Sequence, residues 1–157
     1  MPIVNTPVSF LCCLLLLAGV GSARADLESP TAVDWLGPCK SYLRALEGDS
    51  SADDFDLTYC IGMTQGIVNG MRTGSQLGAL SMGSTLAVRY DLDPGEVFDI
   101  FQGRSPDTLL QICTPAAAGV TDHVKIIAAY LDSHPDKSGQ PLAEIFFEAL
   151  QEAWPCE

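Results

Sequence analysis

The sequence predicts an all-α protein: a small bundle of about four to six helices that ends in an αα-hairpin and is held by two disulfides. Apolar residues recur at every third or fourth position along most of the chain, which is the period of an amphipathic helix. Capping residues precede several of these segments, and glycine or proline follows them. An even number of cysteines outside the N-terminal segment completes the pattern.

Residues 1–25 have the composition of an export signal. An almost uninterrupted apolar run from Val8 to Val20 is followed by small residues ending in Ala23-Arg24-Ala25, which fits a signal-peptidase site. The run is shorter than the ~20 apolar residues of a membrane-spanning helix. We therefore predict a signal that is cleaved before Asp26, rather than a retained anchor. The mature domain, residues 26–157, is then periplasmic and has no stable membrane insertion.

The charge of the chain limits its partners. The sequence has 20 acidic and 8 basic residues, a net charge of −12. Loss of Arg24 with the signal leaves 7 basic residues and a net charge of −13. Nucleic acid is excluded as a partner, because phosphate binding needs a basic face. A basic protein partner is compatible with this charge, although acidity for solubility alone gives the same composition.

The four cysteines of the mature domain predict two disulfides. Cys39, Cys60, Cys113 and Cys156 are even in number, and an exported protein meets an oxidising compartment. Their spacing does not resemble that of a zinc site. Three pairings are possible on the count alone.

The first half of the mature domain predicts two helices. One covers about 32–47 and ends before Gly48, and a polar loop follows over 48–54. The second is expected to be capped by Asp56 and to present an apolar face from Leu57 to Met71. Residues 76–90 are ambiguous between helix and strand, with helix preferred.

Glycines recur every four residues in the second predicted helix, at Gly62, Gly66, Gly70, Gly74 and Gly78. A glycine in a helix interior costs about 1 kcal/mol relative to alanine. One interpretation is therefore close helix packing, within the fold or across a dimer. The other is that the later glycines end the helix and form a loop.

The second half of the mature domain carries clearer boundaries. Asp93-Pro94-Gly95-Glu96 is a helix start, with Asp as N-cap and Pro at the first helical position. A short helix is expected after Ser105-Pro106. Thr121 is expected to cap a helix that Pro135 stops, and the last helix follows over about 142–150. The last two helices form the predicted αα-hairpin.

The hairpin also favours one disulfide pairing. It returns the chain to the level where it began, which brings Cys156 near Cys113. Cys39 and Cys60 lie at similar distances on either side of the loop between the first two helices. We therefore predict the pairs Cys39–Cys60 and Cys113–Cys156.

The residue pattern does not predict an enzyme, a metal site or a cofactor. The two histidines, His123 and His134, are expected on the polar side of a helix and at a helix end, where they have structural roles. The carboxylates at 91, 93, 96 and 99 lack the spacing of a calcium loop, and capping accounts for Asp93 and Glu96. We therefore expect a binding protein without catalytic residues.

Three short motifs resemble one family. Tyr59-Cys60-Ile61-Gly62 with Gly66 is similar to a helix start of this family, and Cys113-Thr114-Pro115 to its entry into the last hairpin. The ending resembles the family from Ala129-Tyr130-Leu131 through His134-Pro135-Asp136 to Trp154-Pro155-Cys156. These are motifs of the Rap/Tai proteins, periplasmic immunity proteins of type VI secretion systems.

The resemblance implies a small, helical and often dimeric protein that binds and blocks an effector. Characterised Tai members block peptidoglycan amidases, so an amidase-like toxin is the expected partner, with a homodimer possible. Met63, Trp154 and a longer segment over 73–111 depart from the family pattern. No interface residues are carried over for this reason, and the candidate contact regions are 49–56 and 73–111. The alternative is a periplasmic protein of housekeeping or stress type, with a chaperone-like role.

Overall fold

The computed structural model describes residues 29–102 and 104–156, except for the side chains of Phe98 and Gln102. The predicted signal peptide lies outside these residues. Within them, the all-α prediction is confirmed: six α-helices and one short 3-10 helix follow one another, and the extended pairings are isolated bridges. The elements are α2 (Ala32–Leu46), α3 (Asp54–Tyr90), α4 (Pro94–Gln102), α5 (Pro106–Leu110), α6 (Val120–Ser133), η1 (Pro135–Lys137) and α7 (Leu142–Ala153).

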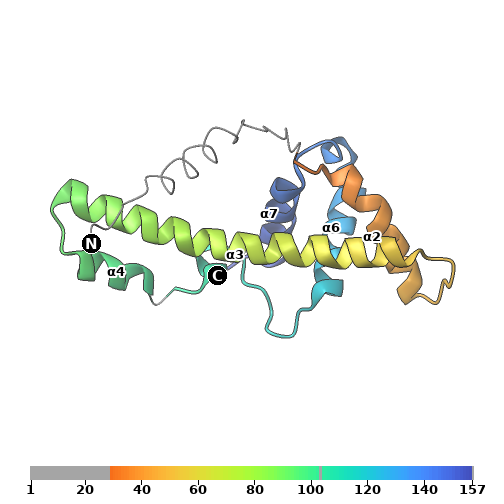
Figure 1. The fold of residues 1–157 in the computed structure, drawn as a ribbon, viewed down its shortest axis with the longest axis horizontal. Helices are drawn as coiled ribbons and strands as arrows, with labels where there is room; N and C mark the ends of the chain where they lie inside the picture. Colours follow the sequence, from red (N-terminus) through yellow and green to blue (C-terminus); the bar gives the residue numbers. More distant parts are fainter. Residues whose placement is uncertain (1–28, 103, 157) are drawn as a thin grey trace, which may run out of the picture.

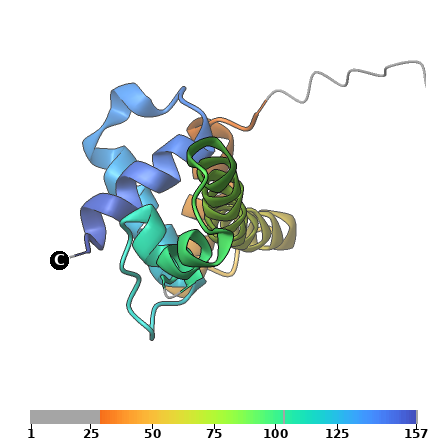
Figure 2. The same cartoon turned by 90° about the vertical axis from the view of Figure 1, so that its left-hand side faces the viewer.

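The long helix α3 sets the shape of the molecule (Figure 1). Around its first half, α2, α6 and α7 pack together, and we call this part the body. Its second half runs on beyond the body, and α4 folds back along it (Figure 1). We call residues 73–102, the second half of α3 with α4, the arm. The view turned by 90° looks roughly along the second half of α3 from the tip of the arm, with α4 beside it (Figure 2).

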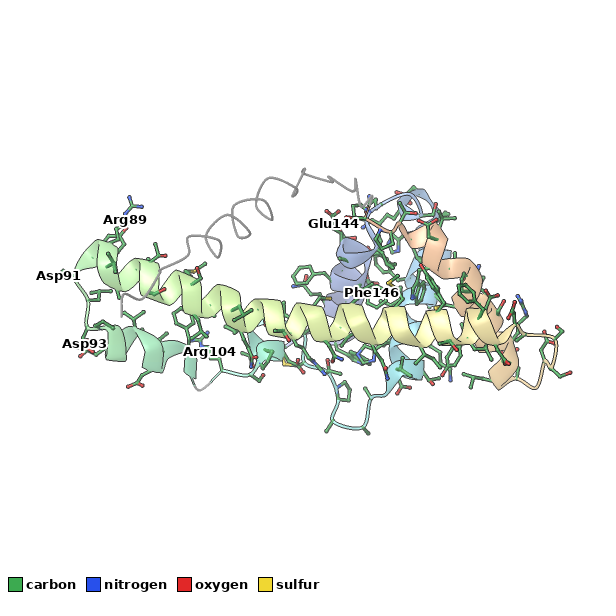
Figure 3. All side chains as sticks on the ribbon, in the orientation of Figure 1. Arg89, Asp91, Asp93, Arg104, Glu144 and Phe146 are labelled. Carbon is green, nitrogen blue, oxygen red and sulfur yellow. A yellow bond between two sulfur atoms is a disulfide. The ribbon has the colours of Figure 1, made fainter. Side chains whose placement is uncertain are left out.

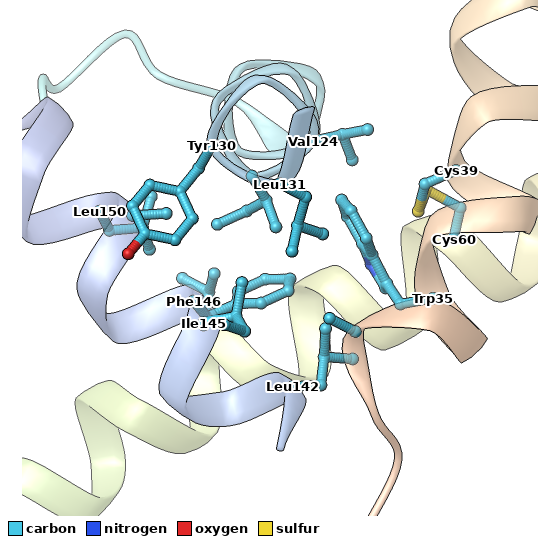
Figure 4. Packing of buried hydrophobic residues seen from close by; sticks show 14 of the residues in the cluster. Trp35, Cys39, Cys60, Val124, Tyr130, Leu131, Leu142, Ile145, Phe146 and Leu150 are labelled. Carbon is cyan, nitrogen blue, oxygen red and sulfur yellow. A yellow bond between two sulfur atoms is a disulfide. The ribbon is translucent and has the colours of Figure 1, made fainter. Parts of the chain in front are cut away.

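The core of the body forms around Trp35 of α2 (Figure 4). Its ring meets Phe146 of α7 edge to face, with ring centroids 5.5 Å apart. Its indole N–H donates to the hydroxyl of Thr64 in α3, at 3.0 Å. A buried indole N–H needs such a partner. Four helices therefore share one core, to which α6 adds Val124, Ile127 and Leu131.

Both predicted disulfides are present. Cys39–Cys60 joins α2 to α3, and both residues are fully buried. Cys113–Cys156 joins the segment before α6 to the segment after α7. The backbone N–H of Cys113 also donates to the carbonyl of Trp154, at 2.7 Å. The αα-hairpin of α6 and α7 is confirmed, and the second disulfide closes its open end.

Two predicted caps are wrong by a few residues. Asp53, rather than Asp56, caps α3 by accepting a hydrogen bond from the backbone N–H of Phe55. Gly119, rather than Thr121, is the N-cap of α6. The hydroxyl of Thr121 lies 2.7 Å from that of Tyr42 in α2. The Thr121 side chain, which the local sequence pattern assigns to capping, thus makes a tertiary hydrogen bond instead.

The recurring glycines do not end α3, which continues for 37 residues to Tyr90. The helical interpretation of 76–90 is therefore confirmed. A Cβ atom built on Gly62, Gly66 or Gly70 would meet nothing within 4 Å, so these glycines do not serve close packing within the chain. At Gly83 a Cβ would meet the ring of Phe101 at 3.3 Å, and this glycine lets α4 dock on α3.

The two short helices begin where the sequence predicts. The carboxylate of Asp93 accepts hydrogen bonds from the N–H groups of Gly95 and Glu96, at 2.8 and 3.1 Å. The hydroxyl of Ser105 accepts from Thr108 N–H at the start of α5, at 3.1 Å. Among the helices of the described ranges, none is both long and apolar enough to cross a bilayer.

Candidate functional site

His123 belongs to the packing of the body. Its Nδ1 lies 2.7 Å from the carbonyl oxygen of Gly119, one turn earlier in α6. Its ring meets the indole of Trp154 edge to face, with centroids 5.1 Å apart. The side chain is buried, although the sequence predicts it on the polar side of a helix. Its Nε2 is the buried side-chain polar atom without a hydrogen-bond partner among the described residues.

His134 lies at the end of α6, as predicted, in a cluster that holds the αα-hairpin together. Its ring stacks on Tyr130, with centroids 4.3 Å apart. The hydroxyl of Tyr130 donates to Glu148 of α7 at 2.9 Å, and the ammonium of Lys137 donates to the same carboxylate oxygen at 2.6 Å. These two hydrogen bonds, that of Lys137 foremost, lower the pKa of Glu148. The cluster is a structural clasp between α6, η1 and α7.

The serine next to His134 is also structural. Ser133 Oγ lies 3.1 Å from Nδ1 of His134, a contact that resembles part of a catalytic dyad. The same hydroxyl lies 2.9 and 3.1 Å from the helix carbonyls of Tyr130 and Ala129. A serine that donates back to its own helix is ordinary helix chemistry. The pair therefore completes the end of α6.

The acidic cluster at the arm tip does not form a metal site in the part of the chain that the structure describes. There, no three His, Cys, Asp or Glu side chains come together so that they could hold a metal ion. Asp93 is engaged in capping α4, and Asp91 ends α3 in the left-handed conformation, with φ of 52°. Both lie at the far end of the arm (Figure 3).

The loop between α2 and α3, the first candidate contact region, is fixed by its own hydrogen bonds. Asp49 accepts from the hydroxyl and the N–H of Ser51, at 2.6 and 2.9 Å. These bonds lower the pKa of Asp49, and Arg44 lies 3.6 Å from the same carboxylate. Few side chains of this loop are left to offer an apolar anchor, and the exposed Phe55 at the start of α3 is the exception.

The arm, which lies within the second candidate contact region, carries most of the exposed apolar surface. Eleven large hydrophobic side chains are exposed in the described residues, and seven of them lie between Leu77 and Ile100. Val88 is 87 % exposed, and Leu77 and Tyr90 are each more than 60 % exposed. Such a concentration on one part of a small protein marks an interaction site. The arm is therefore the candidate binding surface.

A groove lies at the base of the arm, where α4 ends and α5 begins. Its volume is about 260 Å³. Leu77 and Leu80 of α3 form one side, and Phe101 and Leu109 form the other. Arg104 stands at this groove, below α3 in Figure 3. The ion pair between Arg72 and Asp107, at 3.0 Å, ties α5 to α3 next to it.

The candidate contact region 73–111 contains the groove, but no sequence pattern predicts the groove itself. The sequence assigns no individual role to Leu77, Leu80, Arg104 or Leu109. A signal was present in the sequence, since leucines at 77 and 80 interrupt a stretch that is otherwise small or polar. The side chains that lie across the groove from these leucines are set by how α4 and α5 fold back along α3.

The comparison with known proteins identifies one family. The sequence-family model of the Rap1a immunity proteins matches residues 31–156, a range that includes every described helix. No curated protein and no solved structure shows a significant match. The match confirms the resemblance to Rap/Tai-type proteins that the cysteine and hairpin motifs indicated. The chain therefore belongs to the family of Rap1a immunity proteins.

Proposed function

We propose that the protein is a periplasmic immunity protein that binds a type VI secretion effector, a peptidoglycan amidase, and blocks it. The family match over residues 31–156 is the observation that carries this proposal. Two disulfides and the family itself indicate a protein that works outside the cytoplasm. The predicted signal over 1–25 supplies the route of export.

Neutralisation by binding needs a surface rather than a reaction. The histidines and the serine beside His134 are engaged in the body, as described above. The arm offers exposed apolar side chains, which supply most of the energy at the centre of a protein interface. Its rim is acidic, which speeds encounter with a basic partner.

Co-expression with an effector tests the proposal directly. A type VI amidase effector from the same organism is sent to the periplasm of a bacterial host, together with this protein. We expect survival with the full chain, and lysis with a matched variant that lacks residues 1–25 and stays in the cytoplasm. Equal lysis with every amidase effector of that organism would contradict an amidase target.

Purified proteins separate binding from catalysis. We expect the release of cell-wall fragments by the amidase to stop at an equimolar amount of this protein, because one copy covers one active site. Inhibition that needs a large excess of protein, or that continues to deepen with time, would argue against simple binding.

We also propose that the protein forms a homodimer through the outer face of α3. Gly62, Gly66 and Gly70 lie on the side opposite the buried Thr64 and Val68, because residues two apart on a helix point about 200° apart. From Gly62 to Met82, every exposed residue of α3 is uncharged. In so acidic a protein, two copies avoid mutual repulsion best at such a face.

Bulky substitutions on this face test the homodimer. We expect the wild-type protein to have twice the mass of one chain by light scattering. The double variant Gly66→Leu with Gly70→Leu should be monomeric with unchanged helical circular dichroism, since a single chain has room at both sites. A monomeric wild-type protein at all concentrations would rule the dimer out.

The exposed apolar arm also gives a chaperone-like role a specific basis. Such a role predicts that the protein suppresses the aggregation of unrelated unfolded proteins, without saturation at equal stoichiometry. The immunity role predicts no such general effect and a single saturable partner. An aggregation assay with a standard thermally unfolded enzyme distinguishes them.

A further inference from the structure

The groove at the base of the arm has the size of a side-chain site. Its volume of about 260 Å³ falls below the ~300–1,000 Å³ of most small-molecule sites. Its two sides are formed by Leu77 and Leu80 on α3 and by Phe101 and Leu109 opposite. A single large apolar side chain can fill such a space, in the way that anchor residues fill pockets at protein interfaces.

Arg104 adds a preference for an aromatic occupant. Arg104 lines the groove and makes no ion pair with the described carboxylates. A guanidinium over an aromatic ring gains cation–π attraction, which an aliphatic side chain cannot provide. The groove therefore favours a phenylalanine, tyrosine or tryptophan side chain over leucine.

The arm beyond the groove, toward its tip, is strongly acidic. Asp91, Asp93, Glu96 and Asp99 are exposed along the tip and α4, and no lysine or arginine of the described residues forms a salt bridge with them. The guanidinium of Arg89 lies 5.9 Å from the ring of its neighbour Tyr90, within cation–π range, rather than against these carboxylates. The outer part of the arm, beyond the groove, is thus negative.

The negative charge of the arm favours a basic protein partner over a second copy of this chain. A second copy of the chain would bring four more carboxylates against this tip, and like charges across an interface cost free energy. A basic protein surface would meet them favourably and would be steered toward the arm. The homodimer face around Gly62, Gly66 and Gly70 is uncharged and lies nearer the start of α3 than the groove, whose α3 side begins at Thr73.

We propose that the groove docks an aromatic side chain that projects from a basic surface of the effector, with Leu77, Leu80, Phe101 and Arg104 holding the ring. Lysines or arginines of the same partner surface meet Glu96 and Asp99, which are exposed on α4 beyond the groove. The identity of the partner as an effector rests on the proposed function above, whereas the chemistry of the site follows from the groove and from the acidic outer part of the arm.

A peptide probe tests this chemistry without any effector. The probe is a short peptide with one central phenylalanine between lysines, added to oxidised, isotope-labelled protein purified from the periplasm of an expression host. We expect NMR shift changes centred on Leu77, Leu80 and Phe101. The matching alanine peptide should bind about tenfold more weakly, and a glutamate-flanked peptide should leave the groove unchanged.

Two outcomes would overturn the site chemistry. One is that the phenylalanine and alanine peptides shift the groove residues equally, which would leave no role for the ring. The other is that the changes spread to acidic residues of the body such as Glu144 and Glu152, which would show non-specific attraction to negative charge.

Charge-reversal variants carry the test to the effector itself. Glu96→Lys with Asp99→Lys changes the net charge as much as Glu144→Lys with Glu152→Lys, on exposed residues of α4 and α7 respectively. We expect the first pair to weaken effector binding at least about tenfold, mostly through a slower association rate, and the second pair to change it less than about twofold.

A substitution inside the groove tests whether the groove is needed for protection. Leu80→Asp should abolish protection of cells, whereas Val33→Asp, at an exposed position of α2, should protect as the wild type does. Full protection by Leu80→Asp would refute the groove while leaving the immunity role intact. Failure of the wild-type protein to protect, with normal peptide binding, would refute the immunity role and leave the groove as a binding site.

Discussion

Trp35 shows how one side chain links three helices of the body. It is fully buried, packs against Phe146 and donates its indole N–H to Thr64. The hydroxyl of Thr64 is itself almost fully buried, so water cannot replace it as a partner. The side chain of α2 is thus held in one orientation between α3 and α7.

Replacing that hydroxyl should be costly. We expect Thr64→Val to lower the free energy of unfolding by about 1–3 kcal/mol, because it leaves a buried donor unsatisfied. Thr64→Ser, which keeps the hydroxyl, should cost less. Urea unfolding followed by tryptophan fluorescence measures both, and an unchanged midpoint for Thr64→Val would show that the hydrogen bond contributes nothing.

The carboxylate of Glu148 should make the αα-hairpin sensitive to acid. Hydrogen bonds from Lys137 and Tyr130 lower its pKa below the ordinary value of 4.5. A group with a lowered pKa in the folded state adds stability above its unfolded pKa, and loses it as the pH falls through the folded value. The clasp is therefore intact at neutral pH and released in acid.

We expect Glu148→Gln to lower stability at about pH 7, and the difference from wild type to shrink at about pH 3. Denaturant unfolding at the two pH values measures it. Glu152→Gln, on an exposed residue near the end of the same helix, is the matched control. A difference that stays the same at both pH values would contradict the clasp.

At the scale of elements, different contacts hold the two halves of α3 in place. Its first half is buried against the body and bonded to α2 through Cys39–Cys60. Its second half is covered by α4, where Gly83 allows Val97 and Phe101 to approach and Ala87 is buried. The glycines between these parts reduce helix propensity. A Cβ atom at these positions would meet nothing within 4 Å, so packing inside the chain does not require them, and contact with another protein is the role left for them.

Alanine substitutions distinguish the two sets of glycines. We expect Gly66→Ala and Gly70→Ala to raise stability by about 1 kcal/mol each, because the added Cβ meets nothing within 4 Å. Gly83→Ala should give no gain, since its Cβ would press on Phe101 at 3.3 Å and shift α4. Thermal unfolding at concentrations where single copies predominate measures the three variants, and a gain at Gly83 would contradict the docking of α4.

At the scale of the whole molecule, the two disulfides differ in access. Cys39 and Cys60 are fully buried, whereas Cys113 is exposed. Loops of 21 and 43 residues are closed, and such crosslinks contribute about 3–4 kcal/mol each by restricting the unfolded chain. Both therefore stabilise the body, while the arm has none.

Mild reductant should open the bonds in order. We expect Cys113 and Cys156 to be alkylated first, in the folded protein, and Cys39 and Cys60 only as the protein unfolds. Mass spectrometry of alkylated peptides after increasing reduction times measures this order. Simultaneous labelling of all four cysteines below the unfolding midpoint would contradict it.

The helices of the body could largely be predicted from sequence, and the arm could not. In α2, α6 and α7 the apolar residues repeat with the helical period, and a stop signal follows each helix within a few residues. The second half of α3 lacks such a face, because its apolar residues are scattered and exposed. Its extent as a helix depends on α4, which docks from a part of the chain that comes later.

The sequence by itself determined the all-α class, the αα-hairpin, the disulfide pairing and the resemblance to an immunity family. It also predicts an export signal. These depend on local periodicity, on caps and on cysteine count. Only the tertiary structure decided that α3 runs unbroken into an arm, that its glycines face outward, and that Leu77 and Leu80 meet Phe101 in a groove. Such features arise from contacts between residues far apart in the chain, and no local pattern specifies them.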